Sequence, residues 1–189
     1  MAVGVLLGAV NSLSNVLGSP FSPHALRPYP DEGVFFLQVL AAVVGTAWAW
    51  ALVAFALGWW APTAWRAALT AIAALALAAV VYYLSDHALG LNEELATGEM
   101  AYWAVTSVGA GSVFGLLGFL ARGPKWWSLL PGLAAPAVVT LFSYPAGSDR
   151  IQPWPEVFAW VIAAALTIAI TSRWLLTQRR SRARTVHAN

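Results

Sequence analysis

The chain has 189 residues, of which 60% are hydrophobic and 10% are charged, and its mean hydropathy is +0.69. These values lie far outside the usage of soluble domains and predict a protein whose solvent is the lipid bilayer. The sequence contains no cysteine, which excludes disulfides, thiolate metal sites and a cysteine nucleophile. The formal net charge of +2 gives no indication of a nucleic-acid partner, and we expect none.

Six apolar stretches are predicted to be membrane-spanning helices. A helix rises ~1.5 Å per residue and needs about 20 residues to cross ~30 Å of hydrocarbon. The first stretch is short, so it either spans or lies as a re-entrant or surface helix, which would leave five spans. The second is long enough to tilt or to project past the bilayer. In chain order the stretches are residues 2–17, 33–60, 66–85, 100–121, 127–144 and 156–175.

The charged residues of the connecting segments predict the orientation of these spans. Loops on the cytoplasmic side of a membrane are enriched in Lys and Arg. All eight acidic residues fall in alternate loops and eight of the ten basic residues fall in the others, which predicts an all-α bundle with both termini in the cytoplasm. The acidic set is Asp31, Glu32, Asp86, Glu93, Glu94, Glu99, Asp149 and Glu156, and the basic set is Arg66, Arg122, Lys125, Arg173, Arg179, Arg180, Arg182 and Arg184.

Two short cytoplasmic turns each predict an antiparallel helical hairpin. The turns contain Pro62 and Pro124, and the similar residues around them hint at a duplicated hairpin. Pro136 lies inside the fifth span and removes one helical hydrogen bond. In transporters such interruptions occur in corresponding spans of two repeats, but the second span has no proline, so we interpret Pro136 as a structural kink.

Small residues at intervals of three and four lie on one face of the first and fourth spans. In lipid such faces let helix backbones approach closely. We therefore interpret Gly4, Gly8, Gly111 and Gly115 as helix-packing positions. Tryptophans mark both ends of the predicted spans, whereas Trp48 and Trp50 fall near the middle of the second span. An interfacial belt does not explain these two, so packing or a cavity must.

A group of polar residues gathers in the predicted outer half of the bundle. Tyr82 and Asp86 are four residues apart, so both can lie on one helix face. The group could form the floor of a shallow pocket that opens outward, or it could be an interfacial tyrosine belt beside a solvated helix end. Its members are Asn11, Asn15, Gln38, Tyr82, Tyr83, Asp86, His87 and Tyr102.

Residues 177–189 form a basic tail that we separate from the transmembrane bundle of residues 1–176. Near an anionic leaflet each arginine contributes ~1 kcal/mol of attraction. The tail is therefore either a lipid-binding segment or simply the signal that orients the last span. The arginines concerned are Arg179, Arg180, Arg182 and Arg184. The three histidines are scattered, so we expect neither a metal site nor a cofactor.

Several segments together resemble a group of small, uncharacterised actinobacterial integral membrane proteins. They are the glycine- and asparagine-bearing first span, the Gly58-Trp59-Trp60 end of the second, Tyr82-Tyr83-Leu84, and the run from Val113 to Gly118 before Arg122. The resemblance implies a bacterial cytoplasmic membrane and assigns no activity or functional residues.

Three functions remain open on the sequence alone. The first is a non-enzymatic binding or accessory component that works with membrane lipids, as a homo-oligomer or beside other membrane proteins, because we expect no buried ionisable group. The second is a small transporter or channel subunit with an outward-facing polar vestibule. The third is a membrane-embedded enzyme acting on an apolar lipid or isoprenoid, with Trp48, Trp50 and the tyrosines as an aromatic lining and Asp86 as its acid.

Overall fold

The structure is all-helical over the residues it describes. The computed structural model describes residues 1–18, 40, 43–123, 125–143 and 154–186, and the side chains of all of these except 17–18, 142, 154–156 and 180–186. The α-helices are α1 (Ala2–Gly18), α3 (Ala47–Trp60), α4 (Ala64–Ala88), α5 (Thr97–Ala121), α6 (Leu129–Ser143) and α7 (Trp154–Val186), with a 3₁₀ turn at Trp126–Ser128 before α6.

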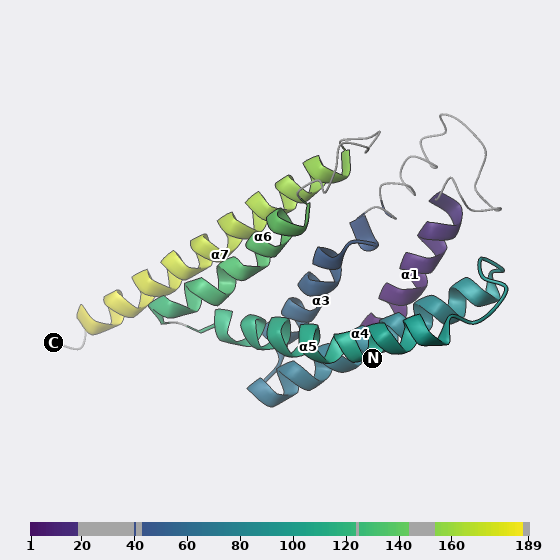
Figure 1. Ribbon diagram of the computed structural model, residues 1–189. Coiled ribbons are helices and arrows are strands. Elements are labelled where there is room, and N and C mark those ends of the chain that lie inside the picture. The colour runs from purple at the N-terminus through teal and green to yellow at the C-terminus, as the bar shows by residue number, and fades with distance from the viewer. Residues whose placement is uncertain (19–39, 41–42, 124, 144–153, 187–189) are drawn as a thin grey trace.

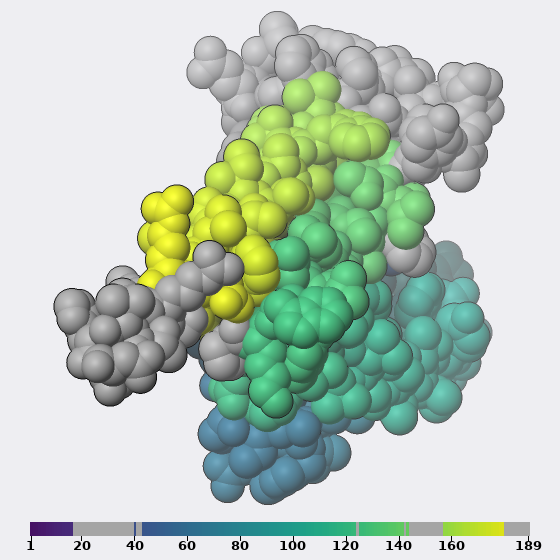
Figure 2. Space-filling view, turned by 90° about the vertical axis from the view of Figure 1, so that its left-hand side faces the viewer, coloured from purple at the N-terminus to yellow at the C-terminus, as the bar shows by residue number. Residues whose placement is uncertain are grey.

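Two helical hairpins form most of the bundle. The antiparallel helices α4 and α5 lie side by side, α1 packs along α4, and α3 crosses α5 (Figure 1). The second hairpin, α6 and α7, lies to one side of them and contacts the bundle through α6. The space-filling view shows α7 along α6 on the upper part of one face, with α5 and α4 below (Figure 2). Side chains of α3 join the hairpin to the bundle: Trp48 packs against Val139 of α6 and Ala159 of α7, and Phe55 packs with Ala135 of α6.

The prediction of an all-helical fold is confirmed over the described ranges, and three of the helices there are long and apolar enough to cross a membrane. They are α4, α5 and the Val157–Arg179 part of α7. The apolar helices Ala2–Val16, Ala47–Trp60 and Trp126–Leu141 are shorter than 18 residues. At ~1.5 Å per residue such helices rise less than the ~30 Å of the hydrocarbon core. Helix α7 also continues past residue 176, where we expected the tail to separate from the bundle.

The second predicted span is not one continuous helix. Thr46 has φ −86° and ψ 147°, an extended conformation that separates Val43 and Val44 from α3. Two side chains bond to the carbonyls freed by this break: Thr46 Oγ1 donates to Val43 O (2.6 Å) and Trp50 Nε1 donates to Val44 O (2.9 Å). The break satisfies its own polar groups and contains no proline, so the lack of a proline in this span did not indicate a continuous helix.

Helix α4 ends in a Schellman motif. Gly90 has φ +71°, its N–H donates to His87 O (3.0 Å), and Leu91 N–H donates to Asp86 O (3.0 Å). Glycine is the residue that adopts this left-handed conformation without a steric cost. The motif fixes where α4 stops and therefore where the acidic α4–α5 turn begins.

Glycines lie where the helices approach most closely. A Cβ at Gly8 would lie 3.0 Å from Tyr82 N, and one at Gly111 would lie 2.6 Å from Ile72 Cα. Contacts of this kind leave no room for a side chain. The glycines Gly4 and Gly8 of α1 thus lie against α4, and so do Gly111 and Gly115 of α5. Gly118, which continues the same spacing of small residues, meets α3, and Gly58 of α3, which the spacing did not indicate, lies against Gly115.

Arg122 ties the two predicted cytoplasmic turns together. Its guanidinium donates to Ala61 O (2.5 Å) and to Pro62 O (3.1 Å) in the α3–α4 turn, and it lies 4.3 Å from the centre of the Phe119 ring. Carbonyls at a helix end have no partner within the helix, so a forked cation satisfies them well. Helix α6, which the second turn leads into, runs through Pro136.

Candidate ligand cavity

A cavity of about 520 Å³ lies among five of the helices. It is lined by Asn11 of α1, by Gly45 before α3, by Ala47, Trp50 and Ala51 of α3, by Leu75, Ala79, Tyr82 and Tyr83 of α4, by Trp103, Thr106, Ser107, Ala110 and Phe114 of α5, and by Val138 of α6. Most of this lining is apolar, and a few polar groups interrupt it. A pocket of this size and composition fits a small molecule.

Small side chains and the break before α3 create the space. Ala51, Ala79 and Ala110 come from three different helices and face the same hollow. Gly45, at the break before α3, has no side chain and lines the cavity directly. Trp50 fills part of the opening, and its indole is fixed by the bond to Val44 O. The cavity is therefore set by the backbone as well as by its side chains.

Behind the cavity wall α1 and α4 share polar contacts. Ser12 Oγ donates to Asp86 Oδ1 at 2.5 Å, and both residues are buried, with 0% and 4% of their surface exposed. Asn15 Nδ2 donates to the Tyr82 hydroxyl at 3.2 Å. The Asp86 carboxylate also lies close enough to Tyr82 to interact with it electrostatically. A hydrogen bond from a hydroxyl to a carboxylate is short and strong, so the bond between Ser12 and Asp86 holds α1 against α4.

The burial of Asp86 corrects one expectation. The prediction that no ionisable group would be buried is wrong, because Asp86 is 4% exposed at the outer end of α4. Its placement depends on Ser12, which lies 74 residues away in the sequence. Buried carboxylates in membrane proteins are costly and often functional. The expected absence of a buried ionisable group therefore no longer argues for a non-enzymatic protein.

The predicted outer cluster divides into three groups. Asn11, Tyr82 and Tyr83 line the cavity, whereas Asn15 and Asp86 lie behind it in contact with Tyr82. The other two described members point elsewhere. His87 is exposed, with its Nδ1 3.2 Å from Asn92 O, and Tyr102 is 64% exposed with its ring against Trp103. Gln38 lies outside the described residues.

Most of the apolar lining could not be predicted from the sequence. Phe114, Ala51 and Ala110 belong to uniform apolar runs, and no local signal distinguishes a cavity wall from a packed or lipid-facing position. The tryptophans of the second span did carry such a signal, because indoles near the middle of a predicted span indicate either close packing or a cavity. Trp48 is buried against α6 and α7, and Trp50 lines the cavity.

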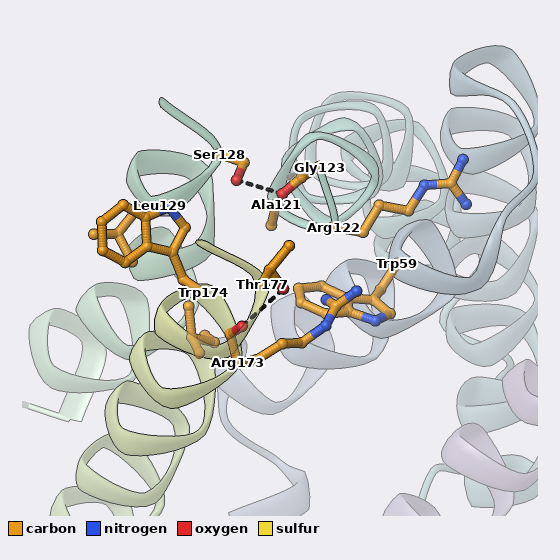
Figure 3. Close-up of a pocket in the computed structure, with 10 residues that line it drawn as sticks. Trp59, Ala121, Arg122, Gly123, Ser128, Leu129, Arg173, Trp174 and Thr177 are labelled. Atoms are coloured by element: carbon orange, nitrogen blue, oxygen red, sulfur yellow. Dashed lines mark hydrogen bonds between the residues drawn. The ribbon is translucent and has the colours of Figure 1, made fainter. Parts of the chain in front are cut away.

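A second, much smaller pocket lies between α3, α5 and α7 (Figure 3). Its volume is about 10 Å³, and Trp59, Arg173 and Trp174 are among its lining residues. The Arg173 guanidinium lies 4.2 Å from the Trp59 ring centre, and Trp174 Nε1 is buried without a hydrogen-bond partner among the described atoms. Such a volume admits about one water molecule, so this pocket is not a ligand site.

Of the four tail arginines, Arg179 is exposed, and the other three have no described side chains. The chain was compared with protein-family models, with curated proteins and with solved structures. None of the three comparisons found a match, so the resemblance stays a prediction and function has to be argued from this chain's own residues.

Proposed function

We propose that this chain is a multi-pass protein of a bacterial cytoplasmic membrane that binds a mainly apolar small molecule without converting it. The cavity of about 520 Å³ carries this proposal. Ligand pockets typically have ~300–1,000 Å³, an apolar and aromatic lining and a few polar groups that fix orientation. Trp50, Trp103 and Phe114 supply the aromatic surface, and Asn11 and Ser107 supply polar groups.

The proposed topology has six crossings and both termini in the cytoplasm. Its support is the separation of charge between the two ends of the described bundle. The exposed acids Glu93, Glu94 and Glu99 lie at the α4–α5 turn, whereas Arg122 lies at the far ends of α3 and α5. Arg173, which stacks on Trp59 at the end of α3, belongs to that second end as well. The positive end corresponds to the cytoplasmic side.

Exposed tryptophans at both ends support the same placement. Trp60, Trp65 and Trp126 have 60–77% of their surface exposed near the basic end, and Trp103 and Trp160 have 49% and 52% exposed. Indole rings concentrate at the two membrane–water interfaces. In the proposed topology these side chains form the two interfacial belts.

A membrane-embedded enzyme is the second candidate, and the contact of Tyr82 with Asp86 favours it. Tyr82 lines an aromatic cavity and has a buried carboxylate beside it. Asp86 itself does not line the cavity, so a proton would have to pass through the Tyr82 hydroxyl. Turnover of a bound lipid that stops in Tyr82→Phe would favour this candidate over simple binding.

The binding proposal is tested by filling the cavity. Ala79→Leu on α4 and Ala110→Leu on α5 place larger side chains in the hollow, and Ala101→Leu on α5 is the matched control because Ala101 is exposed. Each protein is purified from its membranes in mild detergent, and the bound organic molecules are extracted and identified by mass spectrometry. We expect one class of molecule in wild type and Ala101→Leu that is absent from both filled variants.

Equal contents in all four folded proteins would contradict the binding proposal. Thermal unfolding of each variant separates this result from misfolding. A leucine that enters existing space should leave stability within about 1 kcal/mol of wild type, because overpacking costs arise only where no space exists.

A further inference from the structure

We propose that the molecule bound in this cavity is uncharged and carries a hydroxyl or carbonyl group that hydrogen bonds to the Asn11 side chain. This inference rests on the proposed binding function. It goes further by assigning the chemical class of the ligand and the residue that selects it.

Asn11 is a buried amide with unused hydrogen-bonding capacity. It is 8% exposed and lines the cavity from α1. Within the described part of the chain its side-chain amide has no hydrogen-bond partner, in contrast to Asn15 one turn later, whose amide donates to Tyr82. An amide carries two donors and an acceptor oxygen, and leaving them unpaired in an apolar site is costly. A polar group inside the cavity removes that cost.

The hydroxyls of the α5 wall are already bonded. Ser107 Oγ donates to Trp103 O at 2.7 Å, and Thr106 Oγ1 donates to Tyr102 O at 2.9 Å. The Tyr82 hydroxyl accepts the bond from Asn15. Asn11 is thus the polar side chain of the described lining with both donor and acceptor capacity free, and it can match either a hydroxyl or a carbonyl.

The surroundings of Asn11 disfavour a ligand anion. The described lining contains no Lys, Arg or His, and two carboxyl groups interact with its tyrosines, Asp86 with Tyr82 and Glu99 with Tyr83. A phosphate or carboxylate in the cavity would lose its hydration without a counter-charge and would face a like charge across a medium of low dielectric constant. In the described lining, the Asn11 amide would be the one free side-chain donor for such an anion.

A ligand cation is disfavoured as well, because the carboxylate is not at the cavity wall. Asp86 already accepts the Ser12 hydroxyl at 2.5 Å, and Tyr82 lies between it and the hollow. An ammonium group in the cavity would have aromatic faces but no direct ion pair, and an unpaired buried charge is strongly destabilising. An uncharged polar group avoids both costs, and Leu75 and Phe114 can cover its apolar body.

The test identifies the molecule that cavity filling displaces and then changes Asn11. Wild type and Ala110→Leu are extracted as above, and the displaced molecules are classified as neutral, anionic or cationic. We expect a neutral species with a hydroxyl or carbonyl group. A displaced phospholipid, free phosphate ester, fatty acid or amine would overturn this inference and leave the binding function standing, whereas no displaced species would overturn the binding function itself.

Asn11→Ala should retain about fivefold to tenfold less of that molecule after washing, the effect expected for one lost hydrogen bond. Asn11→Ser, which keeps a hydroxyl, should recover part of the retention. Ser14→Ala, on the same helix but bonded to its own backbone, is the control. Unchanged retention in a folded Asn11→Ala protein would overturn the role of Asn11. If that variant does not fold, the charge of the molecule displaced from wild type decides the inference.

Discussion

Two side-chain hydrogen bonds between α1 and α4 stabilise the contact of these helices. Ser12 bonds to Asp86, and Asn15 bonds to Tyr82. In an apolar interior a paired group adds little net stability, but an orphaned one costs its full desolvation penalty. The removal of one partner is therefore the informative experiment.

Ser12→Ala should destabilise the protein by about 2 kcal/mol, because it removes a hydrogen-bond donor from the buried Asp86 carboxylate. Thermal unfolding in mild detergent, followed by circular dichroism, measures the change. Ser112→Ala is the matched control, since that hydroxyl bonds only to Val108 O of its own helix at 2.6 Å. Equal, small effects of the two substitutions would show that the Ser12 bond contributes nothing to stability.

The local part of this contact could be predicted from the sequence, and the remote part could not. Tyr82 and Asp86 are four residues apart, and α4 does place them close to each other. Ser12 meets Asp86 only because α1 packs along α4, and helix pairing is not encoded in the spacing of residues within one helix. The burial of the carboxylate was missed for the same reason.

At the scale of helices, close approach between helix backbones depends on glycines, which have no side chain. Gly115→Ala should destabilise the fold by about 1–3 kcal/mol, because the new Cβ would lie 2.6 Å from Ala67 O and 3.0 Å from Ala71 Cβ. Gly109→Ala on the same helix is the control, since nothing lies within 4 Å of its Cβ position and alanine is the better helix former. Thermal unfolding compares them, and equal stability would contradict the close contact.

Arg122 joins elements through the shape of its guanidinium rather than its charge alone. Arg122→Lys keeps the positive charge but cannot bond to Ala61 O and Pro62 O together. We expect a loss of about 1 kcal/mol in the free energy of unfolding with unchanged membrane orientation. Arg66→Lys, at an exposed arginine that stacks on Trp65, should have little effect. A larger loss at Arg66 than at Arg122 would contradict this role.

The helix break shows the limit of prediction at this scale. Hydropathy gave one long second span because the residues around Gly45 are as apolar as those of α3. The break is stabilised by Thr46 and Trp50, which bond to carbonyls that a continuous helix would have used. Both bonds are local, three and six residues apart, and Gly45 at the break is a poor helix former, but hydropathy registers neither signal.

For the whole molecule, composition and charge predicted more than residue patterns did. Apolar runs predicted an all-helical membrane protein; the described residues confirm the helical fold, and α4, α5 and part of α7 are long and apolar enough to span a membrane. The cavity could not be predicted, because Asn11, Ala51, Tyr82 and Ala110 come from four helices and face one another only after packing. Small or apolar residues look alike in the sequence whether they line a hollow or fill a contact.

The central claim is that the charged ends of this bundle lie on opposite sides of a membrane, with the basic end inside. The chain has no cysteine, so Asn92→Cys in the α4–α5 turn and Thr63→Cys in the α3–α4 turn each introduce a single exposed thiol without changing the charge. Labelling of intact cells with a membrane-impermeant maleimide should modify Asn92→Cys and leave Thr63→Cys unmodified until the membrane is permeabilised. Labelling of Thr63→Cys from outside, or equal labelling of both thiols in intact cells, would contradict the account.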